Sequence, residues 1–152
     1  YSGPRYTSYP TALEFDESYN EHHFLKAVNR YPQRPLSLYL HIPFCHRFCY
    51  FCGCNKQVTR QAHKADRYLD ALEAEIRSRA PLFRQRTVVQ MHWGGGTPTF
   101  LTTTQITRLT GLLRHYFTFA ADAEMSLELD PREIELDVLD HLKSEACAER
   151  RC

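Results

Sequence analysis

Four cysteines gather in the segment from His41 to Lys56, HIPFCHRFCYFCGCNK. Their spacing is C-x3-C-x2-C-x-C, formed by Cys45, Cys49, Cys52 and Cys54. Iron–sulfur clusters are held by cysteine thiolates, and one loop that supplies three of them suits three corners of a cubane cluster. The fourth iron would then be open to a ligand from outside the protein. Three aromatic residues in the segment would shield such a cluster from water and oxygen: Phe48, Tyr50 and Phe51.

The same spacing allows a structural zinc site, with Cys54 or His46 as the fourth ligand. A disulfide framework is disfavoured because the cysteines are clustered, and the context of the chain looks intracellular. Cys147 and Cys152 lie apart from the cluster near the end of the chain.

Two further motifs carry groups that could contact a ligand. The run GGGTP at 94–98 could let a ligand approach the backbone closely, although such a run is by itself more often a plain turn between a strand and a helix. In ELDP at 128–131, the Glu128 carboxylate could accept hydrogen bonds from ribose hydroxyls or an amino group. By itself, Glu128 is more often a solvated or ion-paired acid at the end of a strand.

Alternating strands and helices are expected to position these motifs. Apolar runs predict strands at 36–43, 87–93 and 125–131, and helical spacing predicts helices at about 65–80, 104–117 and 133–145. This order indicates βαβ units with a parallel sheet, preceded by an extension with a short helical pattern around Phe24 to Val28. The cysteine cluster, the glycine run and Glu128 then follow three strands, so all three should meet at the carboxyl edge of the sheet.

The composition is that of an ordinary globular chain. Its 152 residues suffice for one domain, with 43% hydrophobic and 24% charged residues and a net charge of +1. Nothing in this balance points to nucleic acid or to insertion in a membrane. The first residues resemble no export signal, so a cytoplasmic location is expected, and the missing initiator Met suggests that the record begins inside a longer protein.

The motifs together resemble one known family. CHRFCYFC matches the C-x3-C-x2-C signature of the radical S-adenosylmethionine (SAM) superfamily, including the aromatic residue before the last cysteine. YLHIPFCHRFCYFCGCNKQVTR, YSGPRYTSYPTA, HWGGGTPT and ELDPRE are similar to the oxygen-independent coproporphyrinogen III oxidases. The resemblance extends from residue 1 to about 145. It implies a partial (β/α) radical-SAM barrel, made of the first three βα units after an N-terminal extension.

The resemblance also implies a cofactor set. Cys45, Cys49 and Cys52 would bind a 4Fe–4S cluster, while Cys54 would be a nearby residue that binds no iron. The family places two SAM molecules at the cluster. The residues that match contacts to the SAM on iron are Tyr39, Gly95 and Glu128, and those that match contacts to the second SAM are Phe51, Gly96 and Thr97.

The implied reaction is the oxidative decarboxylation of coproporphyrinogen III to protoporphyrinogen IX in anaerobic haem biosynthesis. A 5′-deoxyadenosyl radical would take a hydrogen from the propionate carbon β to the carboxylate, and loss of CO2 and one electron would leave a vinyl group. The electron donor and acceptor stay unidentified, and a monomer is expected. The alternative within the superfamily is a haem-chaperone-like protein, which Cys54 and the N-terminal arm disfavour.

Other polar residues near the motifs are open to two interpretations. His41, His46 and His92 could serve as proton relays or donors to propionates, or be structural histidines. Arg5 could pair with a substrate carboxylate from an arm that closes over the site, or that arm could simply pack on the surface.

The end of the chain departs from the family pattern. After Glu145 the family continues with a glycine and an NR…S.G.Q strand, whereas this chain reads ACAERRC. We therefore divide the chain into an extension (1–35), the first half of a barrel (36–145) and a divergent tail (146–152), and expect the fragment alone to be inactive.

Overall fold

The computed structural model describes residues 14–48 and 55–150, with side chains as far as Glu145. Backbone contacts divide the chain into two units, 1–32 and 33–152. The described part of the first unit contains helix α1 (Glu21–Arg30). The Asn20 side chain begins this helix by accepting hydrogen bonds from the backbone N–H groups of His22 and His23. A helix was expected here, and it is present.

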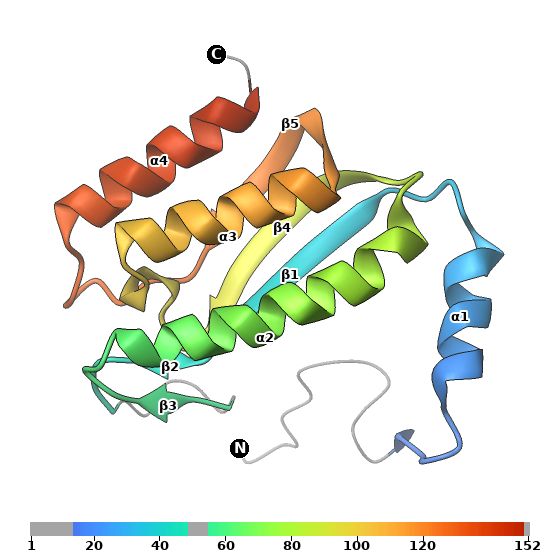
Figure 1. Ribbon diagram of the computed structural model, residues 1–152, viewed down its shortest axis with the longest axis horizontal. Coiled ribbons are helices and arrows are strands. Elements are labelled where there is room, and N and C mark those ends of the chain that lie inside the picture. Colours follow the sequence, from blue (N-terminus) through green and yellow to red (C-terminus); the bar gives the residue numbers. More distant parts are fainter. Residues whose placement is uncertain (1–13, 49–54, 151–152) are drawn as a thin grey trace, which may run out of the picture. The chain divides into compact units, whose positions relative to one another are not determined.

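A parallel sheet forms the centre of the second unit, in the strand order β1-β4-β5. Strand β1 spans Leu36–Ile42, β4 spans Thr87–Gly95 and β5 spans Thr118–Leu127. Figure 1 shows the three arrows side by side, with their heads at the same end. The predicted α/β class with a parallel sheet is confirmed.

Three helices pack on one face of this sheet: α2 (His63–Arg79), α3 (Thr103–Tyr116) and α4 (Leu136–Arg150) (Figure 1). Alternate residues of β1 point into the core between sheet and helices, and of these Ile42 is fully buried. The core includes Leu40, Ile42, Met91 and Trp93 from the strands and Leu69, Ile76, Ile106, Leu109 and Leu113 from the helices. Each such side chain contributes about 1.5–3 kcal/mol through burial.

The other face of the sheet is polar. We call it the polar face; its residues are Ser37, Tyr39 and His41 on β1, Gln90 and His92 on β4, and Glu124 and Ser126 on β5. Ser37 donates a hydrogen bond to Gln90 across β1 and β4, at 3.1 Å. Gln90 in turn donates to Glu124 on β5, at 3.4 Å. Within the described part of the second unit, no helix covers this face.

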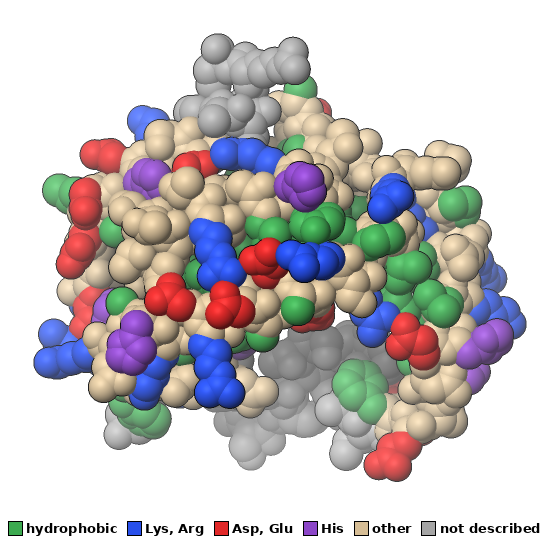
Figure 2. All heavy atoms as spheres, in the orientation of Figure 1, with side chains coloured by type: hydrophobic (Ala, Val, Ile, Leu, Met, Phe, Trp, Pro, Cys, Tyr) green, Lys and Arg blue, Asp and Glu red, His purple; other side chains and the backbone are tan. Residues whose placement is uncertain are grey.

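Ion pairs connect α2 and α3 on the outer surface. Arg108 on α3 contacts both Asp70 and Glu73 on α2, at 2.7 and 2.8 Å. Figure 2 looks onto this helix-covered side, where acidic and basic side chains alternate. Because such pairs are exposed, each contributes at most about 1 kcal/mol.

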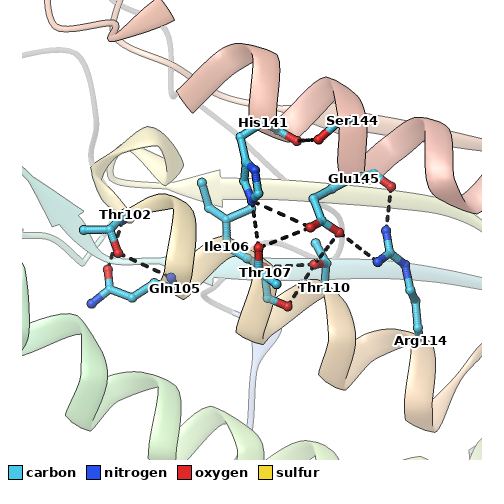
Figure 3. A network of polar contacts seen from close by, with 9 residues as sticks. All are labelled: Thr102, Gln105, Ile106, Thr107, Thr110, Arg114, His141, Ser144 and Glu145. Carbon is cyan, nitrogen blue, oxygen red and sulfur yellow. Dashed lines mark hydrogen bonds and ion pairs between the residues drawn. The ribbon is translucent and has the colours of Figure 1, made fainter. Parts of the chain in front are cut away.

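Helix α4 is anchored to α3 by Glu145 (Figure 3). Its carboxylate accepts hydrogen bonds from Thr107 at 3.2 Å and Thr110 at 2.9 Å, and it pairs with Arg114 at 2.8 Å. Arg114 also donates to the backbone carbonyl of Glu145. The side chain of Glu145 is only 14% exposed, so these donors satisfy a charge that has lost most of its water.

This anchor makes a prediction about stability and pH. Burial works to raise the pKa of Glu145, but hydrogen bonds from Thr110 and Arg114 outweigh it and hold the pKa below its usual value of 4.5. A lowered pKa means that the charged anchor is fully present above pH 4.5 and is lost as the pH falls through the folded-state pKa. The substitution Glu145→Gln should therefore lower the free energy of unfolding by about 1–3 kcal/mol at neutral pH.

Urea unfolding at several pH values measures this difference, which should shrink as the solution becomes acidic. Glu75→Gln on the exposed side of α2 is the control and should change stability by less than about 0.5 kcal/mol. A constant difference between Glu145→Gln and the parent chain at all pH values would contradict the charge-based anchor.

Several features differ from the sequence expectations. Strand β4 ends at Gly95 rather than at Trp93, so the first two glycines of the run lie within the strand. Strand β5 begins at Thr118 rather than Met125 and ends at Leu127, so Glu128 follows the strand instead of lying within it. Helix α4 continues to Arg150 instead of ending near Glu145. A small parallel pair, β2 (Phe44–Cys45) and β3 (Gln57–Val58), had not been predicted.

None of the described helices is both long and apolar enough to cross a bilayer.

Candidate functional site

The backbone on both sides of the cysteine segment is held by the β2–β3 pair. Cys45 ends β2, directly after β1, and lies opposite Val58 in β3. The Gln57 N–H donates to the carbonyl of Pro43 at 2.6 Å, and the Thr59 N–H donates to that of Cys45 at 2.9 Å. The side chain of Cys45 is buried, with 5% of the residue exposed. The segment between Cys45 and Gln57 is therefore closed into a loop at its base.

The glycine run lies directly against Cys45. The N–H of Gly96 donates to the carbonyl of Ile42 at 2.8 Å, and that of Thr97 donates to Phe44 at 2.7 Å. The hydroxyl of Thr97 donates to the sulfur of Cys45 at 3.7 Å. Hydrogen bonds to cysteine sulfur are one way in which a protein sets the potential of a bound cluster.

The glycines leave room where side chains would collide. Gly95 has φ +108°, which favours glycine, and a Cβ atom there would lie 2.6 Å from the ring of His41. A Cβ atom on Gly94 would lie 3.0 Å from Tyr39. On Gly96 it would lie 3.0 Å from the Cys45 sulfur. A buried thiol with a hydroxyl donor and no side chain on its glycine side suits a cluster ligand, so this part of the site fits a bound iron–sulfur group.

Glu128 follows the end of β5 and faces the glycine run. Its backbone N–H donates to Trp93 at 2.9 Å, which extends the pairing of β4 and β5 by one residue. One carboxylate oxygen, Oε2, accepts a hydrogen bond from the Gly95 N–H at 3.1 Å. The other, Oε1, lies 3.5 Å from Nε2 of His92. About half of the side chain stays exposed, so the carboxylate can still accept hydrogen bonds from a ligand.

Tyr39 and His41 lie on the polar face beside the glycines. The Tyr39 hydroxyl contacts Nδ1 of His41 at 3.3 Å, and Nε2 of His41 contacts the carbonyl of Asn55 at 3.0 Å. Behind them, Tyr68 on α2 donates to the backbone carbonyl of His41, and burial raises the pKa of Tyr68. The end of β1 is thus tied to both the cysteine loop and α2.

Charged residues link the cysteine segment to the residues after β5. Arg47 forms an ion pair with Glu133. Two guanidinium nitrogens of Arg132 donate hydrogen bonds to the Asp130 carboxylate, at 2.9 and 2.7 Å. These hydrogen bonds lower the pKa of Asp130 to about 2, so that carboxylate stays charged throughout the physiological pH range. Asp130 therefore acts on the conformation of this turn and is not placed to exchange protons.

The structure brings six of the predicted site residues to one edge of the sheet: Tyr39, Cys45, Gly95, Gly96, Thr97 and Glu128. The other predicted ligands and contacts, with Cys54, lie outside the described residues: Cys49, Phe51 and Cys52. Arg5 lies outside them as well. Among the described residues, no group of three His, Cys, Asp or Glu side chains could hold a metal ion.

The histidines separate into two groups. His41 and His92 contact the predicted site residues Tyr39 and Glu128. His46 instead packs on Phe100, with ring centroids 4.6 Å apart. Ser126, which contacts His92 at 2.8 Å, had not been identified as part of the site. Nothing in its local sequence indicates a role, because its position depends on how β5 pairs with β4.

Comparisons with known proteins identify relatives of this chain. The family model of the radical SAM superfamily matches residues 39–148 of this chain. The oxygen-independent coproporphyrinogen III oxidase of Escherichia coli K12 is 73% identical over 145 residues, which are 95% of this chain and 32% of that protein. The corresponding protein of Mannheimia haemolytica is 62% identical over 131 residues, 86% of this chain and 90% of that protein.

Among solved structures, the chain is similar to coproporphyrinogen III oxidase (HemN) from Escherichia coli, described as a radical SAM enzyme. The TM-score is 0.87 at 72% identity, and the match covers 92% of this chain and 32% of that one. The chain thus spans about a third of the length of most of the relatives named here.

Proposed function

The chain belongs to the radical SAM superfamily and, within it, to the oxygen-independent coproporphyrinogen III oxidases, and from that premise we propose that it forms the cofactor-binding part of such an oxidase. The reaction would be the conversion of coproporphyrinogen III to protoporphyrinogen IX in haem biosynthesis. The observation that carries the proposal is the meeting of Cys45, the glycine run and Glu128 at one edge of a parallel sheet. A cytoplasmic location is part of the proposal.

Cys45 would hold the 4Fe–4S cluster together with Cys49 and Cys52. When bound and reduced, the cluster supplies the electron that cleaves SAM and so gives access to radical chemistry at the substrate propionates. The Thr97 hydroxyl donates to the Cys45 sulfur, and this contact would help to set the reduction potential. Cys54 is proposed to bind no iron.

Two SAM molecules are proposed for the site. Tyr39, Gly95 and Glu128 would contact the one on the open iron, with the Glu128 carboxylate accepting hydrogen bonds from an amino group or ribose hydroxyls. Phe51, Gly96 and Thr97 would contact the second. The half-exposed carboxylate at the Gly95 backbone supports the first of these assignments.

We expect the 152-residue polypeptide alone to bind its cofactors but not to oxidise coproporphyrinogen III. Tyr39 is 59% exposed and the Glu128 side chain 51% exposed. A site this open does not exclude water. Radical chemistry on a substrate requires that water be excluded.

Anaerobic reconstitution with iron and sulfide tests the cofactor assignment. We expect about four irons and four acid-labile sulfides per chain, and an electron paramagnetic resonance signal of the reduced cluster that changes when SAM is added. Zinc bound without acid-labile sulfide would instead support a structural metal module and would overturn the proposal.

A chimera tests the reaction itself. The 145 matching residues of this chain would replace their counterpart in the Escherichia coli oxidase, and protoporphyrinogen formation would be measured under anaerobic conditions. We expect activity within about tenfold of the parent enzyme, since the site residues are retained. An inactive chimera that binds haem tightly would favour the haem-chaperone alternative.

A further inference from the structure

One row of side chains crosses the polar face next to the proposed SAM site. Tyr39 on β1 is paired in register with His92 on β4, and His92 is paired with Ser126 on β5. Neighbouring strands lie about 4.8 Å apart, so residues in register on one face contact each other directly. Glu128 lies two residues beyond Ser126, on the same side.

The imidazole of His92 is held from three directions in this row. The Tyr39 ring stacks on it, with centroids 5.8 Å apart and planes 21° apart. Its Nδ1 atom contacts the Ser126 hydroxyl at 2.8 Å. Its Nε2 atom points to the Glu128 carboxylate at 3.5 Å. The ring therefore has little freedom to turn.

These contacts favour one tautomer of the His92 imidazole. A carboxylate only accepts hydrogen bonds, so a hydrogen bond from His92 to Glu128 needs a proton on Nε2. Nδ1 is then an acceptor, and the Ser126 hydroxyl can donate to it. One oxygen of Glu128 thus lies beside His92 Nε2, and the other accepts a hydrogen bond from the Gly95 N–H.

We propose that His92 is a positioning residue, which orients the Glu128 carboxylate for SAM and is itself oriented by Ser126 and Tyr39. This inference rests on the proposed function, because it takes Glu128 to be a SAM contact. His92 touches no reacting atom. Its effect is to keep the carboxylate in one orientation before SAM arrives, which lowers the cost of ordering that side chain on binding.

Two substitutions at His92 separate positioning from packing. His92→Phe keeps a ring for Tyr39 to stack on but removes the Nε2 donor, whereas the amide of His92→Gln can place an N–H near the same point. In the reconstituted chain we expect His92→Phe to weaken SAM binding by about 10–100-fold, as for other residues that orient a ligand-binding group. His92→Gln should recover part of that loss, and Ser126→Ala should lie between Gln and the parent chain.

The matched control is Gln90→Leu, one row away from His92 and two rows away from Glu128. Gln90 makes the same kind of cross-strand contacts, to Ser37 and Glu124, but none of them is with Glu128. We expect Gln90→Leu to bind SAM as the parent chain does. Equal losses in His92→Phe and Gln90→Leu, or parent-like binding by His92→Phe, would overturn the proposal.

A second measurement does not depend on the cofactors. Imidazole ¹⁵N chemical shifts of His92 in the cluster-free chain report its tautomer, which we expect to be the Nε2–H form in the parent and a mixture in Ser126→Ala. The Nδ1–H form in the parent would overturn the positioning role. If the parent chain binds a cluster but no SAM, the proposed function fails, and these shifts alone then decide whether His92 orients Glu128.

Discussion

Replacing Cys45 with alanine is expected to reduce iron and acid-labile sulfide from about four of each per chain to background after anaerobic reconstitution. Cys45 is the one proposed cluster ligand within the described residues, and its backbone is held on two sides. The carbonyl of Cys45 accepts from Thr59, and the neighbouring carbonyl of Phe44 accepts from Thr97. A nearby side chain cannot easily move in to replace the lost thiolate when the backbone is fixed in this way.

The matched control for this prediction is Cys54→Ala, which removes a thiol from the same segment. Because Cys54 is expected to bind no iron, this variant should keep its cluster and its response to SAM. Circular dichroism would verify that both variants fold. A sulfide-containing, SAM-responsive cluster in Cys45→Ala would show that the ligand assignment is wrong.

The second large effect is expected from Gly96→Ala. A Cβ atom on Gly96 would lie 2.6 Å from the carbonyl oxygen of Phe44 and 3.0 Å from that of Ile42. Both oxygens belong to the backbone and accept hydrogen bonds from Gly96 and Thr97, so neither can move without breaking one of these hydrogen bonds. We expect a loss of about 1–3 kcal/mol in the free energy of unfolding, together with weaker cluster binding, because the Cys45 sulfur is only 3.0 Å from the same point.

Gly111→Ala is the matched control, because it makes the same chemical change in an exposed part of α3. A Cβ atom on Gly111 would meet nothing within 4 Å. Alanine also favours helix over glycine, so this variant should gain about 0.5–1 kcal/mol. Urea unfolding with iron analysis measures both effects, and opposite signs are expected. A neutral Gly96→Ala would mean that the strand ends are not packed as tightly as described.

Strands β1 and β4 could be predicted because apolar runs mark them. The start of β5 could not, since Thr118 to Glu124 contain alanines and charged residues without a clear alternation. These residues become a strand through pairing with β4, whose register shifts between Val88 and Gln90. Helix α4 continues past Glu145 because alanine and charged residues with high helix propensity follow, with neither glycine nor proline to end it.

The site shows the same division. Cysteines, glycines and an acid at three strand ends were sufficient to predict a shared edge, since strand ends of a parallel sheet meet there. The link between Ser126 and Glu128 through His92 was not predictable, because it depends on the register of β4 against β5. The two-residue strands β2 and β3 are too short to leave a periodic pattern in the sequence.

The closed base of the cysteine loop has a consequence for how the protein matures. In zinc fingers, metal binding and folding are one event, so the chain collapses without its metal. Here the loop ends are joined by the β2–β3 pair, and the core residues between sheet and helices do not include the cysteine side chains. We therefore expect the chain to keep its helices and sheet when iron and sulfide are withheld, which circular dichroism of the cluster-free chain under anaerobic conditions would measure.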